Sequence, residues 1–272
     1  MNILNKWVLL TLIEVVFLIG NVNAYNSEGN GVCNCSSCTD CNSALSDNTN
    51  CYNKVKLTAD IINYSGTCIN NPANFSNKIF DCLGNRIDGD YSGYYFGIYL
   101  NEKQNNTIQN CIVTDFAYGI NLHSSSNNTL MNNSVNSNSY GIILPYSSNN
   151  TLMYNSASLN YFGIYLISSS NNTLINNIAN LNNRHGIYLD PNSNYNILNF
   201  NKFYNNNQEG GAYYDIFNQG NNLGDENSCD KAYNWNDLGT WSCSYTSDGK
   251  QRVIFSFPLI FGWNFISIPL EI

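Results

Sequence analysis

Positively charged residues are scarce in this chain. It has 11 Lys and Arg residues against 19 Asp and Glu residues, so its formal net charge is −8 over 272 residues. Nucleic-acid binding depends on clustered basic side chains that neutralise backbone phosphates. The sequence has no such basic patch, which excludes nucleic acid as an expected partner.

Ligands for soft metals are also few. The histidines are His123 and His185, and the methionines are Met1, Met131 and Met153. Copper needs Cys, Met or His ligands, and the ten cysteines have a different explanation, given below. We therefore expect no metal and no other cofactor.

Acidic residues are missing from the middle of the chain. Residues 119–183 contain no Asp or Glu. Hydrolysis of a glycosidic bond needs two carboxyl groups roughly 5–10 Å apart, so this stretch supplies no catalytic pair. The acids that flank it are Asp81, Asp88, Asp90, Glu102 and Asp115 on one side and Asp190 on the other.

The sequence does contain a short, regular repeat. The motif Gly-Ile-x-Leu recurs at intervals of 22, 22, 22 and 23 residues, starting at Gly97, Gly119, Gly141, Gly163 and Gly186. A second motif, Asn-Asn-Thr followed by Ile or Leu, keeps the 22-residue interval at Asn105, Asn127, Asn149 and Asn171. Such a repeat predicts a stacked array whose units bury their apolar faces only against neighbouring units.

Each unit is too short for a pair of helices. Gly-Ile-x-Leu alternates with period two, and β-branched and aromatic residues dominate it, which predicts strands. Runs of Ser and Asn between the motifs predict tight turns. Identical units that stack at about 4.8 Å per layer form parallel sheets along the array. The predicted fold is an all-β parallel β-helix, a solenoid with one coil per 22 residues.

Period two also predicts which side chains point inward. Four aliphatic columns should fill the core: Ile98, Ile120, Ile142, Ile164, Ile187; Leu100, Leu122, Leu144, Leu166, Leu189; Ile108, Leu130, Leu152, Leu174; and Val113, Val135, Ala157, Ala179. The variable position between the first two columns should point outward; it is Tyr99, Asn121, Ile143, Tyr165 and Tyr188. An aromatic column precedes the glycines: Phe96, Tyr118, Tyr140, Phe162 and then His185.

The ends of the chain differ from its middle. Lys6 and an apolar run that ends before Tyr25 predict a signal peptide over residues 1–24, with an uncleaved anchor as the alternative. We expect a Cys-rich cap over 25–53, the β-helix over 54–204 with seven extra residues in 88–95, and an irregular closing segment over 205–252. Residues 253–272 are apolar but contain Pro and Gly, which predicts a pair of β-strands rather than a membrane helix. The strand pair is expected either to pack on the end of the β-helix or to belong to a following, truncated domain.

Ten cysteines follow the predicted signal peptide, and an even number in an exported chain predicts disulfides. Cys82 and Cys111 occupy equivalent positions on successive coils, at a spacing that a disulfide accepts; two buried thiols are the alternative. Two further pairs are expected at the caps, Cys51 with Cys68 and Cys229 with Cys243. For the cluster Cys33, Cys35, Cys38 and Cys41, disulfides or a zinc or iron–sulfur site remain as alternatives, and we favour disulfides.

Eight Asn-x-Ser/Thr sequons are present, and four of them are the repeat itself. They start at Asn34, Asn63, Asn74, Asn105, Asn127, Asn132, Asn149 and Asn171. The repeated sequons are either a ladder of turns that happens to spell the motif or acceptors for glycan.

The repeats Gly-Ile-Tyr-Leu and Ser-Ser-Asn-Asn-Thr-Leu resemble those of the NosD-like right-handed parallel β-helix proteins, which belong to the wider class of carbohydrate-binding proteins and sugar hydrolases. The segment from Phe80 to Gly89 and the Cys33–Cys41 cluster resemble exported archaeal members. The resemblance covers about residues 54–222 and implies a right-handed helix with disulfide-bearing ends. It also implies a copper-delivery function, which the scarcity of ligands makes the weakest alternative.

Three kinds of function remain. A binding module would stack sugars on outward rings at Tyr99, Tyr165 and Tyr188, with asparagines as hydrogen-bond partners; sheet propensity is the equal alternative. A polysaccharide lyase or glycoside hydrolase would use Arg184, His185 and Asp190, where one residue is inserted into the repeat, although an irregular surface explains the same residues.

The third function is a rigid structural module of the cell envelope. We interpret the chain as a secreted or cell-surface protein, structural or adhesive, glycan-binding and non-catalytic. Its expected partners are a polysaccharide or envelope glycan and other surface proteins.

Overall fold

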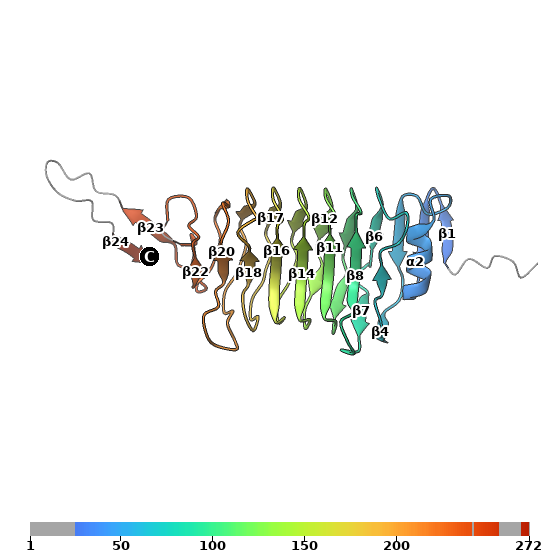
Figure 1. Cartoon of the computed structure of the whole chain (residues 1–272), viewed down its shortest axis with the longest axis horizontal. Helices are drawn as coiled ribbons and strands as arrows, with labels where there is room; N and C mark the ends of the chain where they lie inside the picture. Colours follow the sequence, from blue (N-terminus) through green and yellow to red (C-terminus); the bar gives the residue numbers. More distant parts are fainter. Residues whose placement is uncertain (1–24, 241, 256–267, 272) are drawn as a thin grey trace, which may run out of the picture.

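The structure, a computed structural model, describes residues 25–240, 242–255 and 268–271. Short strands stack along one axis, and successive coils of the chain add a strand to each sheet in turn (Figure 1). The predicted parallel β-helix is confirmed, with successive strands of the repeat 22 residues apart. The predicted signal peptide, residues 1–24, lies outside the described residues.

Three sheets run along the solenoid. The ten-stranded sheet contains β1 (Asn26–Gly29), β2 (Val32–Cys35), β3 (Lys54–Leu57), β6 (Ile79–Asp81), β9 (Thr107–Gln109), β12 (Thr129–Met131), β15 (Thr151–Met153), β17 (Thr173–Ile175), β19 (Ile197–Asn199) and β21 (Leu223–Asp225). The four-stranded sheet contains β4 (Ile61–Tyr64), β7 (Arg86–Gly89), β10 (Ile112–Thr114) and β13 (Ser134–Val135). The eight-stranded sheet contains β5 (Ile69–Asn70), β8 (Phe96–Asn101), β11 (Tyr118–His123), β14 (Tyr140–Pro145), β16 (Phe162–Ile167), β18 (Ile187–Leu189), β20 (Ile216–Asn218) and β22 (Ala232–Tyr233).

Parallel pairing runs from β2 to β22, so the stacked strands extend on both sides of the expected range 54–204. The helix α2 (Cys38–Ser46) interrupts the first coil. In the segment 253–272, the strands β23 (Arg252–Phe255) and β24 (Ile268–Glu271) pair antiparallel. Among the described residues, no helix is long and apolar enough to cross a membrane.

All four predicted aliphatic columns lie inside the solenoid. Every member of these columns is fully buried, from Ile98 and Leu100 through Ala179 to Leu189. The register of the parallel pairs aligns like with like, for example Ile120 with Ile142 and Leu130 with Leu152. The core is therefore a set of stacked identical side chains, and each coil depends on its neighbours for burial.

The glycine column is explained by close backbone approach. A Cβ atom at Gly163 would lie 2.3 Å from the carbonyl oxygen of Gly186 on the next coil. At Gly119 and Gly141 the corresponding distance to the next glycine's oxygen is 2.7 Å. Any side chain would push the coils apart here. Glycine is therefore needed once per coil, which explains why the glycines recur at the interval of one coil.

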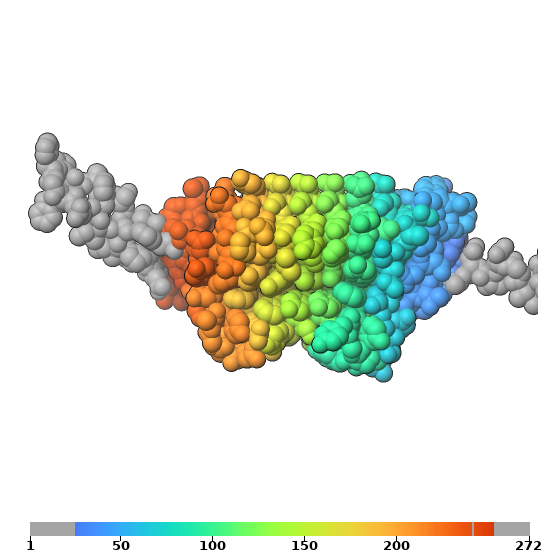
Figure 2. All heavy atoms as spheres, viewed as in Figure 1, coloured from blue at the N-terminus to red at the C-terminus, as the bar shows by residue number. Residues whose placement is uncertain are grey.

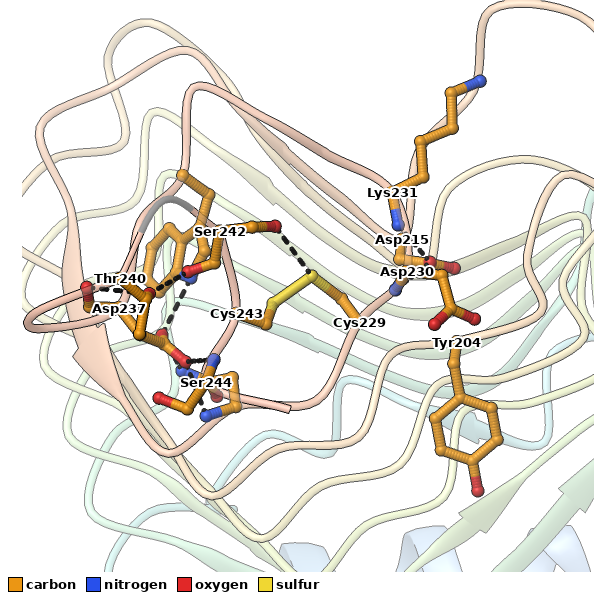
Figure 3. Close-up of a disulfide and its surroundings, with 12 residues drawn as sticks. Tyr204, Asp215, Cys229, Asp230, Lys231, Asp237, Thr240, Ser242, Cys243 and Ser244 are labelled. Carbon is orange, nitrogen blue, oxygen red and sulfur yellow. Dashed lines mark hydrogen bonds between the residues drawn. A yellow bond between two sulfur atoms is a disulfide. The ribbon is translucent and has the colours of Figure 1, made fainter. Parts of the chain in front are cut away.

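Asparagine ladders tie the coils together inside the turns. In one ladder, each member's backbone N–H and side-chain Nδ2 donate to the Oδ1 of the next coil's Asn; its members are Asn133, Asn155, Asn177, Asn201 and Asn227. Asp237 ends this ladder, accepting from Asn227 and from the Ser244 N–H (Figure 3). A parallel ladder through Asn138, Asn160, Asn182 and Asn206 ends in Asp215.

The ladders have a direction, and an aspartate suits their last position. A terminal Asn would carry an amide donor with no next coil to receive it, whereas a carboxylate only accepts. Burial raises the pKa of Asp215. Four N–H groups of Asn206, Asp230 and Lys231 donate to its carboxylate and lower the pKa, but burial outweighs them.

Disulfides close both ends of the solenoid. The predicted bonds Cys82–Cys111 and Cys229–Cys243 are present, and Figure 3 shows the latter. The cluster cysteines are oxidised as Cys35–Cys41, Cys33–Cys51 and Cys38–Cys68.

The predicted pairing of Cys51 with Cys68 is therefore wrong. Stacking of β2 on β3 places Cys51 beside Cys33 of the neighbouring coil. The helix α2 lies against β5, where Asn42 donates to the carbonyl of Cys68, so Cys38 at the start of the helix reaches Cys68 instead.

Candidate functional site

Two loops protrude from one long edge of the solenoid. The first, residues 90–95, joins β7 to β8, and the second, residues 205–213, precedes β20. Figure 2 shows the lower outline of the molecule hollowed between a green and an orange protrusion, which these segments form. The hollow lies over the coils between these two loops, because the turns of those coils have no inserted residues.

This hollow, which we call the groove, has a volume of about 360 Å³. Its lining combines two tyrosines, one leucine and four small polar residues: Tyr91, Asn138, Ser139, Leu159, Asn160, Tyr161 and Asn183. Tyr91 comes from the first loop and the rest from the three coils between the loops. With a layer spacing of about 4.8 Å, the floor extends over roughly 15 Å.

Both walls of the groove are held by backbone hydrogen bonds. In the first loop, the Tyr91 N–H donates to the carbonyl of Asp115 at 3.1 Å, and its hydroxyl donates to the carbonyl of Ser137. In the second loop, the N–H groups of Asn207 and Glu209 donate to the carbonyls of Arg184 and Asn183. The groove is therefore formed before any ligand arrives.

The floor of the groove has an exposed apolar residue in a strained conformation. Leu159 has a φ of 58° and is 58 % exposed. Its equivalents in the same row of turns are Asp115, Ser137, Leu181 and Asn205, and of these residue types Asp and Asn adopt the left-handed conformation at lower cost than Leu. Left-handed backbone and an exposed leucine are both unfavourable for stability, but Leu181 on the next coil combines the same two features outside the groove lining, so they do not by themselves mark the groove.

Arg184 stands at the second wall with its charge already paired. Its Nε lies 3.0 Å from Glu209 Oε2, and its guanidinium lies 4.3 Å from the ring centroid of Tyr161 and 4.8 Å from that of Tyr213. These contacts fix the plane of Tyr161, whose ring is also perpendicular to Phe162. Arg184 therefore acts on the groove by positioning a tyrosine.

His185, the second predicted catalytic candidate, is buried in the aromatic column. Its ring lies between Phe162 and Tyr214, and its Nδ1 accepts from the Tyr214 N–H at 3.0 Å. Burial, helped by the charges of Arg184 and Lys231, lowers the pKa of His185 to about 4. The imidazole is neutral at pH 7 and only 6 % exposed, so it stabilises the column rather than facing the groove.

Asp190, the third candidate, lies at the opposite end of β18 from Arg184 and His185. Its Oδ1 accepts from the Ser168 N–H and from Ser193 Oγ, which closes a turn. The structure thus brings Arg184 and His185 together as neighbours but leaves Asp190 on the other edge.

In the column predicted to point outward, Asn121 and Ile143 are buried, at 7 % and 5 % exposure, and Tyr99, Tyr165 and Tyr188 are partly exposed on the eight-stranded sheet. The ring faces of these predicted sugar-binding tyrosines are occupied. Tyr165 and Tyr188 stack on each other with centroids 4.4 Å apart and an interplanar angle of 8°, and Tyr188 stacks on Phe217. Tyr99 packs on Phe96, separated from Tyr165 by two coils. Faces that are stacked on one another leave ring edges for solvent, which favours a structural ladder at these positions.

A pair of carboxyl groups stands behind the first loop. The strand pairing of β7 with β10 sets Thr114 beside Asp88, and Thr114 Oγ1 donates to Asp88 Oδ1 at 2.6 Å. Burial works to raise the pKa of Asp88, but hydrogen bonds from Thr114, the Asn63 N–H and Asp115 outweigh it and lower the pKa.

Asp115 titrates in the opposite direction. Burial, the hydrogen bond to Asp88 and the negative charge of Asp88 raise its pKa. The two carboxyl groups thus favour sharing one proton.

From the sequence, Asp88 and Asp115 could be identified only as acidic residues that flank the regular repeat. Their meeting depends on the register of β7 against β10, which the bulge in 88–95 obscured. The sequence signal that could have found them is the alignment of Arg86-Ile87-Asp88 with Ile112-Val113-Thr114. Within the described residues, no group of three or more His, Cys, Asp or Glu side chains could hold a metal ion.

Comparison with known proteins agrees with this architecture. A family model described as a right handed beta helix region matches residues 76–227. No curated protein sequence matches the chain.

Several solved structures share the fold at low sequence identity. An alginate lyase from Paenibacillus sp. str. FPU-7 matches with a TM-score of 0.60 and 13 % identity, over 73 % of this chain and 76 % of that one. The A-module of the Azotobacter vinelandii mannuronan C-5 epimerase AlgE6 matches with a TM-score of 0.45 and 15 % identity, over 65 % of this chain and 61 % of that one. At these identities the likeness concerns the fold alone.

Proposed function

This chain belongs to the right-handed β-helix family, and from that premise we propose that it is an exported, non-catalytic protein that binds a polysaccharide across the groove. The observation that carries the proposal is the lining of the groove. Tyr91 is 60 % exposed at one end and Tyr161 stands across from it, and the floor between them carries amide and hydroxyl groups. Aromatic rings with a few placed polar groups suit sugars, which have apolar faces and hydroxyl rims.

A groove between two rigid loops suits an extended ligand. Its floor follows the stacking axis, so a linear glycan would cross successive coils. Asn138 and Asn160 are buried and their amides are engaged in the ladder, so they hold the floor in place rather than contact a ligand. The polar groups that a glycan could reach are those of Ser139 and Asn183.

Charge favours a neutral polymer over a polyuronate. Arg184 is the one cation among the groove lining and the described residues that contact it, and Glu209 already neutralises it. The net charge of the chain is −8, which repels a polyanion at long range. The alginate lyase and the mannuronan epimerase of the comparison act on such polyanions, so the proposed ligand class departs from theirs.

Export is proposed from the disulfides. All ten cysteines form five disulfides among the described residues, a state that persists in oxidising compartments. Together with the apolar N-terminal run, this supports the secreted or cell-surface location, and the NosD-like archaeal affiliation stays part of the same proposal.

The test is affinity electrophoresis through gels that contain neutral glucans, xylan or mannan, or alginate or polygalacturonate. We expect retardation by at least one neutral polymer, and a loss of about tenfold in affinity for Tyr161→Ala. Tyr154→Ala is the matched control, because Tyr154 is 59 % exposed on a turn outside the groove. Equal losses in both variants, or no retardation by any polymer, would contradict the groove as the binding site.

A second function, cleavage of a glycan, would need two carboxyl groups on either side of the bond, roughly 5–10 Å apart. Asp88 and Asp115 hydrogen-bond to each other, which leaves no room for a sugar between them, so this pair does not favour cleavage. Incubation of each polymer with the protein, followed by a reducing-end assay, tests for cleavage. New reducing ends that disappear in Asp115→Asn would replace binding by hydrolysis as the function.

A further inference from the structure

The four repeated Asn-Asn-Thr motifs form one row along the regular long edge of the solenoid. Figure 1 shows the turns that follow the strands of the eight-stranded sheet along the edge opposite the two protruding loops. In each motif the first asparagine is exposed at such a turn with a left-handed backbone, and φ is 59° at Asn105, 58° at Asn127, 59° at Asn149 and 57° at Asn171. The second asparagine is buried in a ladder, and the threonine begins a strand.

The fold itself does not require this motif. Asn77 takes the left-handed position in the coil before Asn105, but Tyr195 takes it in the coil after Asn171, with φ of 60°, so an asparagine is not required there. Ile79 and Ile197 take the threonine position, as their pairing with Thr107 and Thr173 shows. The stacking geometry therefore accepts other residues at both ends of the motif, and turn formation alone does not account for its presence in four successive coils.

Three asparagines of the row have an unengaged amide. Among the described residues, none accepts a hydrogen bond from Nδ2 of Asn127, Asn149 or Asn171, and all three are exposed. Other sequons differ: Nδ2 of Asn34 donates to Glu28 at 2.7 Å, and Nδ2 of Asn132 donates to Asn110 at 2.8 Å.

Two more sequon amides are engaged and one is not. Asn105 donates to Asn77 and Asn74 donates to the carbonyl of Ser46. Asn63, away from the row, is exposed and has no Nδ2 hydrogen bond to any described residue. The described part of the chain therefore contains sequons whose asparagine Nδ2 is hydrogen-bonded and sequons whose asparagine Nδ2 is free to react.

We propose that the regular edge is a glycosylation edge, modified with N-linked glycan at Asn127, Asn149 and Asn171. The donor is a polyprenyl-phosphate-linked or polyprenyl-pyrophosphate-linked oligosaccharide, delivered by a membrane oligosaccharyltransferase that reads the Asn-x-Thr motif. A bond forms between Asn Nδ2 and the anomeric carbon of the sugar, and the bond from that carbon to the lipid phosphate oxygen breaks. The lipid phosphate leaves with the electron pair, and one amide proton passes to solvent.

The spacing of the coils limits the occupancy of this row. Neighbouring acceptors lie about 4.8 Å apart along the axis, which leaves no room for two hydrated oligosaccharides side by side. We therefore expect glycan on alternate coils, either at Asn149 or at Asn127 and Asn171 of the same molecule. Because the groove lies on the other edge, glycan here would leave it open while covering the repeated surface.

The experiment is mass spectrometry of the protein isolated from its source organism. The stretch between Lys103 and Arg184 holds no Lys or Arg, so chymotrypsin rather than trypsin is used, with electron-transfer fragmentation to place each glycan. We expect glycan on the three row asparagines, never on two adjacent coils of one molecule, and none on Asn34 and Asn132. Unmodified peptides for all three row asparagines would overturn the proposal, and equal modification of Asn34 would overturn its geometric basis.

A variant in the same host separates modification from folding. Thr129→Ile, Thr151→Ile and Thr173→Ile together destroy the three sequons while introducing the residue that the fold already carries at position 197. We expect this triple variant to be exported and folded, with an intact mass lower than the parent's by the glycan carried on the three row asparagines. A variant that keeps the full glycan mass of the parent would contradict the assignment of the row.

Discussion

The two long edges of the solenoid each contain hydrogen-bonded ladders of Ser or Asn side chains, but only one of the edges carries inserted loops. Along the regular edge, turns with Ser and Asn repeat coil after coil, and buried Ser125, Ser147 and Ser169 continue from one to the next. Along the other edge, the loops 90–95 and 205–213 break the repeat while the ladder through Asn138 and Asn160 continues underneath.

This difference separates stability from recognition within one molecule. Residues that have an equivalent in the next coil fill the core, stack as rings or continue a ladder. The groove arises only where insertions leave the repeat, and its lining includes Tyr91, which belongs to an insertion and has no equivalent in the next coil. The predictions below test whether the two sets of residues are as independent as the geometry indicates.

The glycine column should give the largest effect. In Gly163→Ala the new Cβ would meet the carbonyl oxygen of Gly186 and Asn182 Nδ2, at 2.3 and 2.8 Å, so two coils must separate. We expect a loss of at least about 3 kcal/mol in the free energy of unfolding, measured by urea denaturation. A loss below about 1 kcal/mol would show that the coils can move apart at low cost.

An interior ladder position should cost nearly as much. Asn155→Ala removes the acceptor of the N–H and Nδ2 groups of Asn133 and the donor to the carbonyl of Leu130. Orphaned buried polar groups cost about 1–3 kcal/mol each, so we expect a loss of about 3 kcal/mol. The control is Asn192→Ala on an exposed turn, which should stay within about 0.5 kcal/mol of the parent.

His185 should make stability depend on pH. Its pKa is about 4 in the folded chain and about 6.5 when unfolded, so the unfolded state binds the extra proton first. The contribution is complete above pH 6.5 and falls as the pH drops to 4, by at most about 3 kcal/mol. Urea unfolding from pH 7 to pH 4 measures it, and His185→Phe should remove this part of the slope. An unchanged slope in the variant would assign the dependence to other groups.

The substitution Leu159→Asn should have the smallest effect on stability, and it best separates residues that stabilise the solenoid from residues that bind the ligand. Leu159→Asn places a residue suited to the left-handed backbone on the floor of the groove, so stability should rise by about 0.5–1 kcal/mol. Affinity for the retained polymer should fall a few-fold, because the apolar contact is lost. Leu181→Asn, in the same row but outside the groove lining, should give the same gain without that loss. Equal affinities would leave Leu159 without a binding role.

The sequence by itself determined the fold. The alternation inside Gly-Ile-x-Leu predicts the strand and its buried face, and the 22-residue interval predicts which residues stack on the next coil. One repeated motif therefore predicts both the local structure and the long-range contacts. That is why the buried columns, the outward tyrosines and the Cys82–Cys111 bond could be predicted. Each depends only on a residue and its equivalent one coil away.

Only the tertiary structure decided the candidate site. The groove needs two insertions more than 100 residues apart in sequence to stand on one edge, and neither insertion has an internal copy to compare. The acid pair depends on a register that a loop of seven extra residues hides. The pairing of Cys68 with Cys38 depends on a helix laid across the first coil, and the stacked ring faces of Tyr165 and Tyr188 depend on side-chain rotamers. Period and spacing place residues on a coil, but the contacts between unlike segments follow from packing in three dimensions.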